Sequence, residues 1–567
     1  MNSMEHIRSE FDNLIEDTLN LYVNDLSEKE GVIYHIGEII ESCYRNFGFE
    51  QGEVSRLGAE ILIPKILERK NKSSTHERVE IEKIIEAIVF SAEYRNYRDI
   101  IFYSYNDPDS ISWRKINNKF EIRNSDRSIV RQLAAETYSS AFNSIGMSDK
   151  IYSGNNENIE DLLRGSKSFD YKNENVVKAI EYISNELAIK IDSFFSYVNH
   201  ESNISFGEYS YNEFFSIYNM LMFYALYERH NAKANNLAGV VIYTEEELLY
   251  AVETNIGIER KKSKKILSDI SLASRSTFVK IQDKSKYYLF PTAFSLLDGI
   301  SSNLKLFAKR DSDAFSERFA AIIGNGLVEE VESEFKKFRN FKTIKDLKLN
   351  SYDNTLPDID LVAISYEPSL GFHFFISEVK NNLPATWAKE YLKSTGKKGF
   401  ITKALSQVNK VQEFLDSEKG KLLLCELAIK EFSHLDTKKL FPKGFLVHSH
   451  QLIISSQSMG LFFSEEKANI IEGDLLRHII RASDGDVNYI LFHLRELDNI
   501  IDECVDDFDS TYKVGNFDIV NSDFKLKKHF RLAEHKYLSN GTFEELERMS
   551  LQSGYTFVDY LNLSLDK

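Results

Sequence analysis

Asp360 and Glu378 lie in a mostly apolar stretch, "DIDLVAISYEPSLGFHFFISEVK", residues 358–380, and their carboxylates could share one site. The segments on either side of Pro368 are rich in β-prone residues, and the Pro and Gly residues between them mark a turn. A hairpin that is symmetric about residue 369 places Asp360 opposite Glu378, with Cβ atoms about 4.5–5.5 Å apart. Because two carboxylates this close repel each other, a cation is expected between them. Hard oxygen ligands of this kind suit Mg²⁺, so the stretch predicts a metal site held by Asp360 and Glu378.

Lys380 follows Glu378 by two residues. Side chains alternate along a strand, so the lysine and the carboxylate point to the same face of the sheet. A lysine there can help to deprotonate an attacking water and can stabilise negative charge on a phosphate in the transition state. The three residues therefore predict metal-assisted hydrolysis of phosphodiester bonds with Mg²⁺ or Mn²⁺.

This arrangement resembles the PD-(D/E)xK nuclease superfamily, which includes restriction endonucleases, Holliday-junction resolvases and many phage-defence nucleases. The matching residues are Asp360, Glu378 and Lys380, with Asp358 as an auxiliary acid. A rival alignment takes the literal "PD" at Pro357 and Asp358 and makes Asp358 the ligand. We prefer Asp360, because the acid in many members lies on a strand of the form found in "DIDLVA".

The resemblance spans about residues 310–455 and implies further site residues. Family members often carry a glutamate on the helix before the sheet, a role open here to Glu329 or Glu330. The helix after the lysine strand supplies a glutamine in several families, which matches Gln407. The tyrosine expected four residues later is Val411, so this second motif is half present.

A local excess of lysines follows the predicted active-site strand, although the chain as a whole has a net charge of -17. Binding to a phosphate backbone requires local positive charge. The residues predicted to contact nucleic acid are Lys393, Lys397, Lys398 and Lys403. A solvated basic helix is the alternative, and the same alternative holds for the run "RKKSKK" at 260–265.

The elements that must position these residues form the second half of the chain. Residues 1–300 show long helical periodicity and predict an all-α region for sensing, regulation or assembly. Residues 301–567 predict a mixed, restriction-endonuclease-like β-sheet flanked by helices, of α+β or α/β class. Two helices are expected at about 312–323 and 326–339, with a turn at the glycines of "IIGNG", and "NYILF" at 488–492 is expected to be a strand.

The amino-acid composition bears on the cellular compartment and on membrane insertion. Three cysteines without metal-ligand spacing indicate a reducing compartment, and there is neither an apolar leader nor an apolar run long enough to span a bilayer. We expect a cytoplasmic protein that does not enter a membrane.

The sequence thus predicts a Mg²⁺-dependent nuclease, with DNA favoured over RNA as its substrate. By family analogy we expect a bacterial defence effector. We also expect it to form a homo-oligomer, which could bind a partner protein. The alternative is a non-catalytic subunit that uses a nuclease-like fold to bind nucleic acid or to serve as a scaffold, with the helical region binding partners.

Overall fold

The structure is a computed structural model. It describes residues 3–26, 28–69, 80–106, 111–124, 158–166, 172–194, 198–199, 201–368, 370–383, 390, 392, 399–435, 439, 444–456, 468–503, 505–526 and 555–558. The chain forms two compact units. Unit 1 comprises Met1–Arg123, Gly146–Ala320 and Thr511–Val520, and the main segment of unit 2 is Ala321–Ser510.

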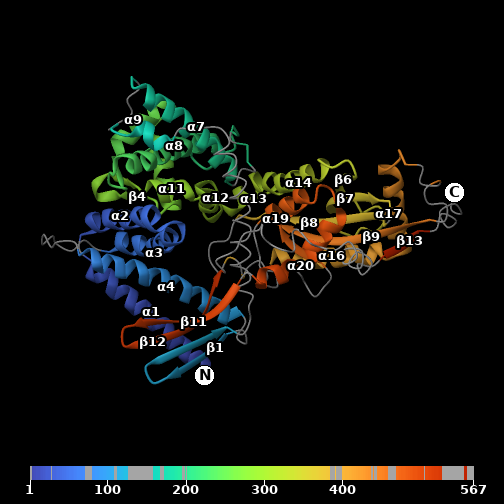
Figure 1. The fold of residues 1–567 in the computed structure, drawn as a ribbon, viewed down its shortest axis with the longest axis horizontal. Coiled ribbons are helices and arrows are strands. Elements are labelled where there is room, and N and C mark those ends of the chain that lie inside the picture. Colours follow the sequence, from blue (N-terminus) through green and yellow to red (C-terminus); the bar gives the residue numbers. More distant parts are fainter. Residues whose placement is uncertain are drawn as a thin grey trace. The chain divides into compact units, whose positions relative to one another are not determined.

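Unit 1 is mainly helical (Figure 1). Its helices are α1 (Ser3–Asp25), α2 (Lys29–Phe47), α3 (Phe49–Glu68), α4 (Ile81–Asn106), α6 (Ile159–Leu163), α7 (Glu174–Ser193), α8 (Tyr211–Asn235), α9 (Glu245–Asn255), α10 (Arg260–Ala273), α11 (Pro291–Leu296), α12 (Gly299–Arg310) and α13 (Ser312–Arg318). A small sheet of order β3-β5-β4 lies among them, with strands β3 (Val241–Thr244), β4 (Phe278–Ile281) and β5 (Lys286–Leu289) and the 3-10 turn η1 (Gln282–Lys284).

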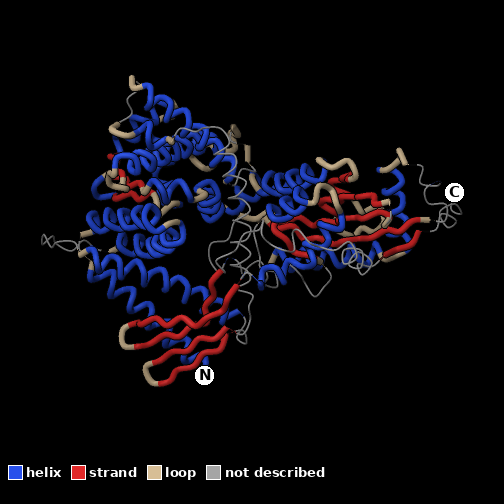
Figure 2. Tube along the Cα trace, viewed as in Figure 1, coloured by secondary structure: helices blue, strands red, loops and turns tan. Residues whose placement is uncertain are grey.

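A second sheet in this part of the chain joins segments from the two ends of the sequence, of order β1-β2-β12-β11. Its strands are β1 (Ile111–Ile116), β2 (Lys119–Asn124), β11 (Val505–Val514) and β12 (Phe517–Leu526). Phe120 of β2 contacts Phe517 of β12 with ring centroids 5.3 Å apart, and Phe11 of α1 packs on Phe120 at the same distance. Residues 1–300 are mainly helical, as expected, but they are not all-α, because they also contain strands β1 to β5 (Figure 2).

Unit 2 is built on a mixed sheet of order β10-β9-β8-β7-β6. The strands are β6 (Phe341–Leu347), β7 (Ile359–Glu367), β8 (Gly371–Lys380), β9 (Phe445–Ser455) and β10 (Asn469–Glu472), and β13 (Tyr555–Val558) also pairs with β9. β6, β7 and β8 are antiparallel neighbours, whereas β9 runs parallel to β8 and to β10. The helices are α14 (Ala320–Lys336), α16 (Phe400–Leu415), α17 (Glu418–Glu431), α19 (Gly473–Ala482) and α20 (Val487–Glu503).

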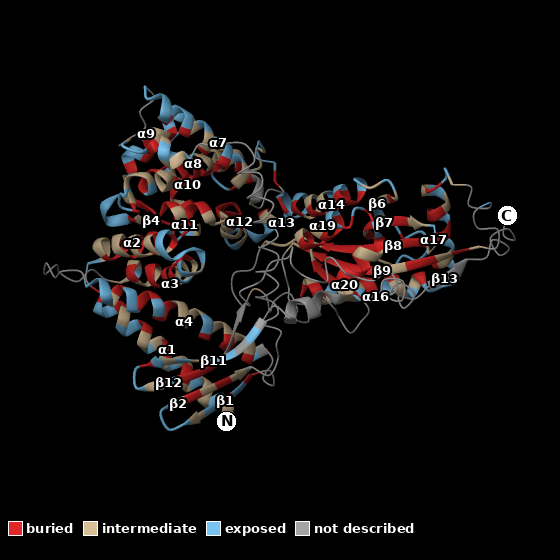
Figure 3. Cartoon of the chain, in the orientation of Figure 1, coloured by how far each residue is buried: buried red, intermediate tan, exposed pale blue. Residues whose placement is uncertain are grey.

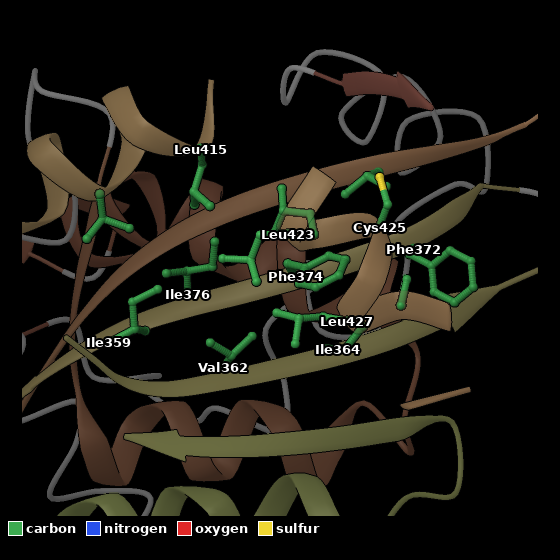
Figure 4. Close-up of a cluster of buried hydrophobic side chains, with 14 of the residues drawn as sticks. Ile359, Val362, Ile364, Phe372, Phe374, Ile376, Leu415, Leu423, Cys425 and Leu427 are labelled. Atoms are coloured by element: carbon green, nitrogen blue, oxygen red, sulfur yellow. The ribbon is translucent and has the colours of Figure 1, made fainter. Parts of the chain in front are cut away.

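Helices cover both faces of the sheet, and strands β7, β8 and β9 are buried along most of their length (Figure 3). On one face, side chains of β7 and β8 such as Val362 and Phe374 pack with Leu415 of α16 and Leu427 of α17 (Figure 4). On the other face, Phe335 of α14 lies 5.9 Å from Phe375 of β8, measured between ring centroids. This two-sided burial explains the almost continuous apolar strands.

Two local expectations are wrong. Gly324 and Gly326 do not form a turn, because α14 runs through them from Ala320 to Lys336 and buries Leu327, Val331 and Phe335. The stretch "NYILF" is not a strand but the first turns of α20. In the part of the chain that the structure describes, none of the helices has the length and apolar character needed to cross a bilayer.

Candidate active site

The hairpin of β7 and β8 has the register that the sequence predicts. Leu361 lies opposite Ser377, and the pairing continues to Glu367 opposite Gly371. The next positions beyond Leu361 and Ser377 are Asp360 and Glu378. Both alternate in phase with Val362 and Ile376, which belong to the core beneath α16 and α17. The two carboxylates therefore lie at one end of the hairpin, on the α16 face of the sheet.

Asp360 is held against β8 through its own carboxylate. Its Oδ2 accepts a hydrogen bond of 2.7 Å from the backbone N–H of Val379. A charged acceptor of this kind makes a comparatively strong hydrogen bond. The bond fixes Asp360 beside Val379, the residue that separates Glu378 from Lys380.

Glu378 is almost completely buried, with 6% of its surface exposed. Lys380 forms an ion pair with Oε1 of Glu378, and the side chain of Gln407 from α16 hydrogen-bonds to the same residue. Three segments thus meet here: the start of β7, the end of β8 and the first half of α16. They bring together four of the predicted residues, Asp360, Glu378, Lys380 and Gln407.

The electrostatics of the site disfavour two negative charges. Burial raises the pKa of Glu378, and the nearby charge of Asp360 raises it further, while Lys380 and Gln407 act in the opposite direction. Burial also raises the pKa of Asp360, against the lowering effects of the Val379 N–H and Lys380. A divalent cation would relieve this cost, because it stabilises both charged forms.

The end of β8 is fixed from two sides just after Lys380. The Nδ2 group of Asn381 donates to the carbonyl of Ile323 in α14. On the other side, the carbonyl of Lys380 accepts from the N–H of Ser456 at 3.1 Å, and the N–H of Asn382 donates to Oγ of Ser456 at 2.8 Å. These contacts limit the positions that the lysine backbone can adopt.

The other predicted acids make different contacts. Asp358 is 41% exposed and pairs with Lys348 at 2.7 Å. Glu329 lies 3.8 Å from Lys345, and Glu330 pairs with Arg477 of α19.

The position of α14 explains why its glutamates do not reach the pair. This helix contacts Phe375, whose side chain points to the opposite face of β8 from that of Glu378. The structure does not bring Glu329 or Glu330 together with Asp360 and Glu378.

The α14 face of the sheet also carries three buried histidines, His373, His448 and His450. Their rings are stacked, with centroids of His373 and His448 4.5 Å apart, and Nδ1 of His373 lies 3.1 Å from Nε2 of His450. Burial lowers the pKa of His373 to about 3 and that of His450 well below its usual value. Parallel rings do not converge on a metal ion, so this stack acts as core.

Of the four predicted nucleic-acid contacts, Lys393, Lys397 and Lys398 lie outside the described residues. Lys403 is exposed on α16 and precedes Gln407 by four residues, which places both on the same side of the helix.

Lysines of the basic run at 260–265 form ion pairs with carboxylates of unit 1. Lys262, Lys264 and Lys265 form ion pairs of 2.7–3.1 Å with Glu213, Glu245 and Asp269 respectively. This favours the structural alternative for that run.

Asp346 of β6 is a charged neighbour that the sequence reasoning missed. The pairs of Lys345 with Leu361 and of Leu347 with Ile359 flank it, so Asp346 and Asp360 take corresponding positions on adjacent strands. Its φ of 51° is in the left-handed region, which is uncommon for a residue other than glycine. The alternation of "KTIK" before it could have indicated strand β6 and so this position.

The donor set limits which metal the site can hold. Among the described residues, no group of three or more His, Cys, Asp and Glu side chains could hold a metal ion. A pair of carboxylates nevertheless suits Mg²⁺ or Mn²⁺, since such ions commonly take one or two carboxylates and complete their shell with water and substrate phosphate. The donors therefore fit an ion bound together with substrate, and they do not fit a cage built from protein alone.

Comparisons of this chain with protein-family models, with curated proteins and with solved structures found no match.

Proposed function

We propose that this chain is a metal-dependent nuclease that hydrolyses phosphodiester bonds. The observation that carries the proposal is the meeting of Asp360, Glu378, Lys380 and Gln407 on one face of a sheet. A buried carboxylate pair with raised pKa values is costly. Such sites are favoured by function more often than by stability.

The order of elements supports a restriction-endonuclease-like core. α14 is followed by the antiparallel strands β6, β7 and β8, then by α16, and then by β9 parallel to β8. The acids and the lysine lie on the second and third strands of this unit, as the resemblance to the PD-(D/E)xK superfamily implies. We assign this fold as part of the proposal.

Each residue has a separate task in the proposed reaction. Asp360 and Glu378 hold Mg²⁺ or Mn²⁺, which supplies charge neutralisation and a more acidic bound water. Lys380 orients the attacking water and donates hydrogen bonds to phosphate oxygens as negative charge develops on them. Gln407 orients the carboxylate of Glu378, and Lys403 offers an exposed positive charge beside it.

By family analogy, we propose DNA as the substrate and bacterial defence as the biological role. The exposed charge of Lys403 next to Gln407 is consistent with guidance of a phosphate backbone into the site. Homo-oligomerisation and recruitment of a partner protein stay predictions.

Cleavage by the full chain tests the proposal. Plasmid, linear duplex, single-stranded DNA and RNA are each incubated with Mg²⁺, with Mn²⁺ or with EDTA. We expect cleavage that requires the metal and is lost in Glu378→Gln and Lys380→Ala, while Asp358→Asn, which removes a charge two residues from Asp360, keeps it. Cleavage that persists in Glu378→Gln contradicts the proposal.

The rival function predicts a different result in the same experiment. A non-catalytic subunit would bind nucleic acid in a salt-dependent way without cutting it under any metal condition. The quadruple alanine variant of Lys393, Lys397, Lys398 and Lys403 would then weaken binding and reduce its salt slope.

A further inference from the structure

Unit 1 contains a cavity of about 330 Å³ that the nuclease proposal does not use. It lies between the end of α3, the first residue of α2, the second half of α10 and strand β4 with η1. This volume is at the lower end of the range of about 300–1,000 Å³ that is typical of ligand sites. It suits a molecule the size of a mononucleotide.

Two cations that line the cavity, Lys29 at the start of α2 and Arg275 just after α10, hydrogen-bond to backbone carbonyls. The ammonium group of Lys29 donates to the carbonyl of Leu67 at 3.0 Å, and Nε of Arg275 donates to the carbonyl of Leu272 at 3.0 Å. Lysine has three donors and arginine has five, so each keeps donors for a ligand. Among the described residues, the side-chain partners of Lys29 and Arg275 are these carbonyls and not carboxylates.

The surrounding cations differ in this respect. Lys280 also lines the cavity, but its ammonium group lies 2.7 Å from Glu245. Lys264 of α10 pairs with the same glutamate at 2.7 Å. Carboxylates therefore neutralise the neighbours, whereas only carbonyl dipoles hold Lys29 and Arg275.

The other residues that line the cavity restrict the net charge of the ligand and favour an apolar part in it. Two acids, Glu68 and Asp283, lie on the wall together with the cations. They disfavour a highly charged ligand such as a triphosphate. Apolar side chains including Pro64, Leu272 and Val279 provide a surface for a ring.

We propose that this cavity binds a small phosphate monoester with an apolar or aromatic body, with the phosphate between Lys29 and Arg275. Ser271 can donate a further hydrogen bond, because its Oγ accepts from the N–H of Lys280 and keeps its own proton. The ligand bridges α2 and α3 to α10 and β4, so its binding stabilises unit 1. This proposal does not depend on nuclease activity.

Calorimetric titration of the full chain with AMP tests it, with adenosine as the uncharged control and inorganic phosphate as a competitor. AMP is expected to bind saturably and to raise the melting temperature, with adenosine at least about tenfold weaker, as the loss of a charged hydrogen bond requires. Inorganic phosphate is expected to compete with AMP.

Two variants and a matched control assign the binding to the cavity. Arg275→Met and Lys29→Met keep the apolar stem and remove the charge, and each should weaken AMP binding about tenfold or more. Lys261→Met removes an exposed charge of α10 outside the cavity and should leave binding unchanged. Absent AMP binding, equal binding of adenosine, or wild-type affinity in a folded Arg275→Met variant would each overturn the proposal.

Discussion

The sharpest prediction concerns Asp360→Asn, which should stabilise the protein in EDTA while abolishing its response to Mg²⁺. The pKa of Asp360 is raised, chiefly by burial, so the folded state favours its neutral form. The energetic cost of the charge is absent at low pH, appears as pH rises from the unfolded pKa through the folded pKa, and is complete at neutral pH. Asparagine removes this charge and keeps an oxygen that can accept from the N–H of Val379.

The size of the effect combines the burial of the Asp360 charge with the repulsion between Asp360 and Glu378. Two unit charges about 5 Å apart, the usual separation of opposed residues, repel by roughly 3 kcal/mol at an effective dielectric constant of about 20. Attraction between Asp360 and Lys380 offsets most of this, which leaves a gain of about 1 kcal/mol, or a rise in melting temperature of about 2–4 °C for a unit of 150–250 residues.

Thermal unfolding of unit 2 with EDTA and with Mg²⁺ measures both parts of the prediction. At a metal concentration ten times the Kd, the wild-type protein should gain about 1.4 kcal/mol, and Asp360→Asn should gain nothing and lose at least about a hundredfold in cleavage rate. Asp358→Asn, the matched control, loses only an exposed pair with Lys348 and should keep the metal response. A lower melting temperature in EDTA together with an intact Mg²⁺ response would refute the reasoning and make Asp360 a structural charge.

Three further predictions concern other parts of the chain. Asn381→Ala should lower kcat about tenfold or more with little change in KM, because it frees the end of the lysine strand from Ile323 and small misplacements are costly. Acid should destabilise the protein as pH falls from about 6.5 toward 3, because buried histidines such as His373 have lowered pKa values; urea unfolding as a function of pH measures this. Ile519→Ala should destabilise unit 1 by about 2–5 kcal/mol, because Ile519 is fully buried; the fluorescence of Trp113, measured with Trp387 replaced by phenylalanine, reports the loss of stability.

Matched variants control these three experiments. Asn382→Ala removes the same amide from the next residue, which hydrogen-bonds to Ser456 through its backbone. Equal kcat losses in both variants would contradict a positioning role of Asn381. Replacing the exposed His434 with leucine should leave the acid response unchanged, whereas His373→Leu should flatten it. Asp518 is exposed, so Asp518→Ala is the control for Ile519→Ala. If it destabilised unit 1 as much as Ile519→Ala does, burial of Ile519 would not be the cause.

The hairpin could be predicted because its register depends on local chemistry. A short turn around Pro368 fixes which residues face each other, and alternation then assigns Asp360, Glu378 and Lys380 to one face. The contribution of Gln407 came from the family resemblance and not from spacing. The structure brings its side chain to Glu378.

The failures arise where distant or competing effects outweigh local signals. Each glycine in a helix costs about 1 kcal/mol, yet α14 passes through Gly324 because burial of Leu327 and Val331 outweighs that cost. A short apolar run such as "NYILF" does not distinguish a strand from a buried helix. The face of the sheet on which α14 lies decides the surroundings of Glu329 and Glu330, and a single sequence carries no signal for that choice.

The sheet that joins β2 to β12 has a consequence for biosynthesis. Residues 1–124 leave the ribosome long before Thr511–Val520, by roughly 20–80 s at about 5–20 residues per second. Until then the edge of β2 has no strand partner from β12, and Phe120 lacks its contact with Phe517. Unit 1 is therefore completed only after strands β6 to β10 of the sheet that carries Asp360 and Glu378 have been synthesised. A chain that terminates early would leave an open strand edge, which marks it for quality control or aggregation.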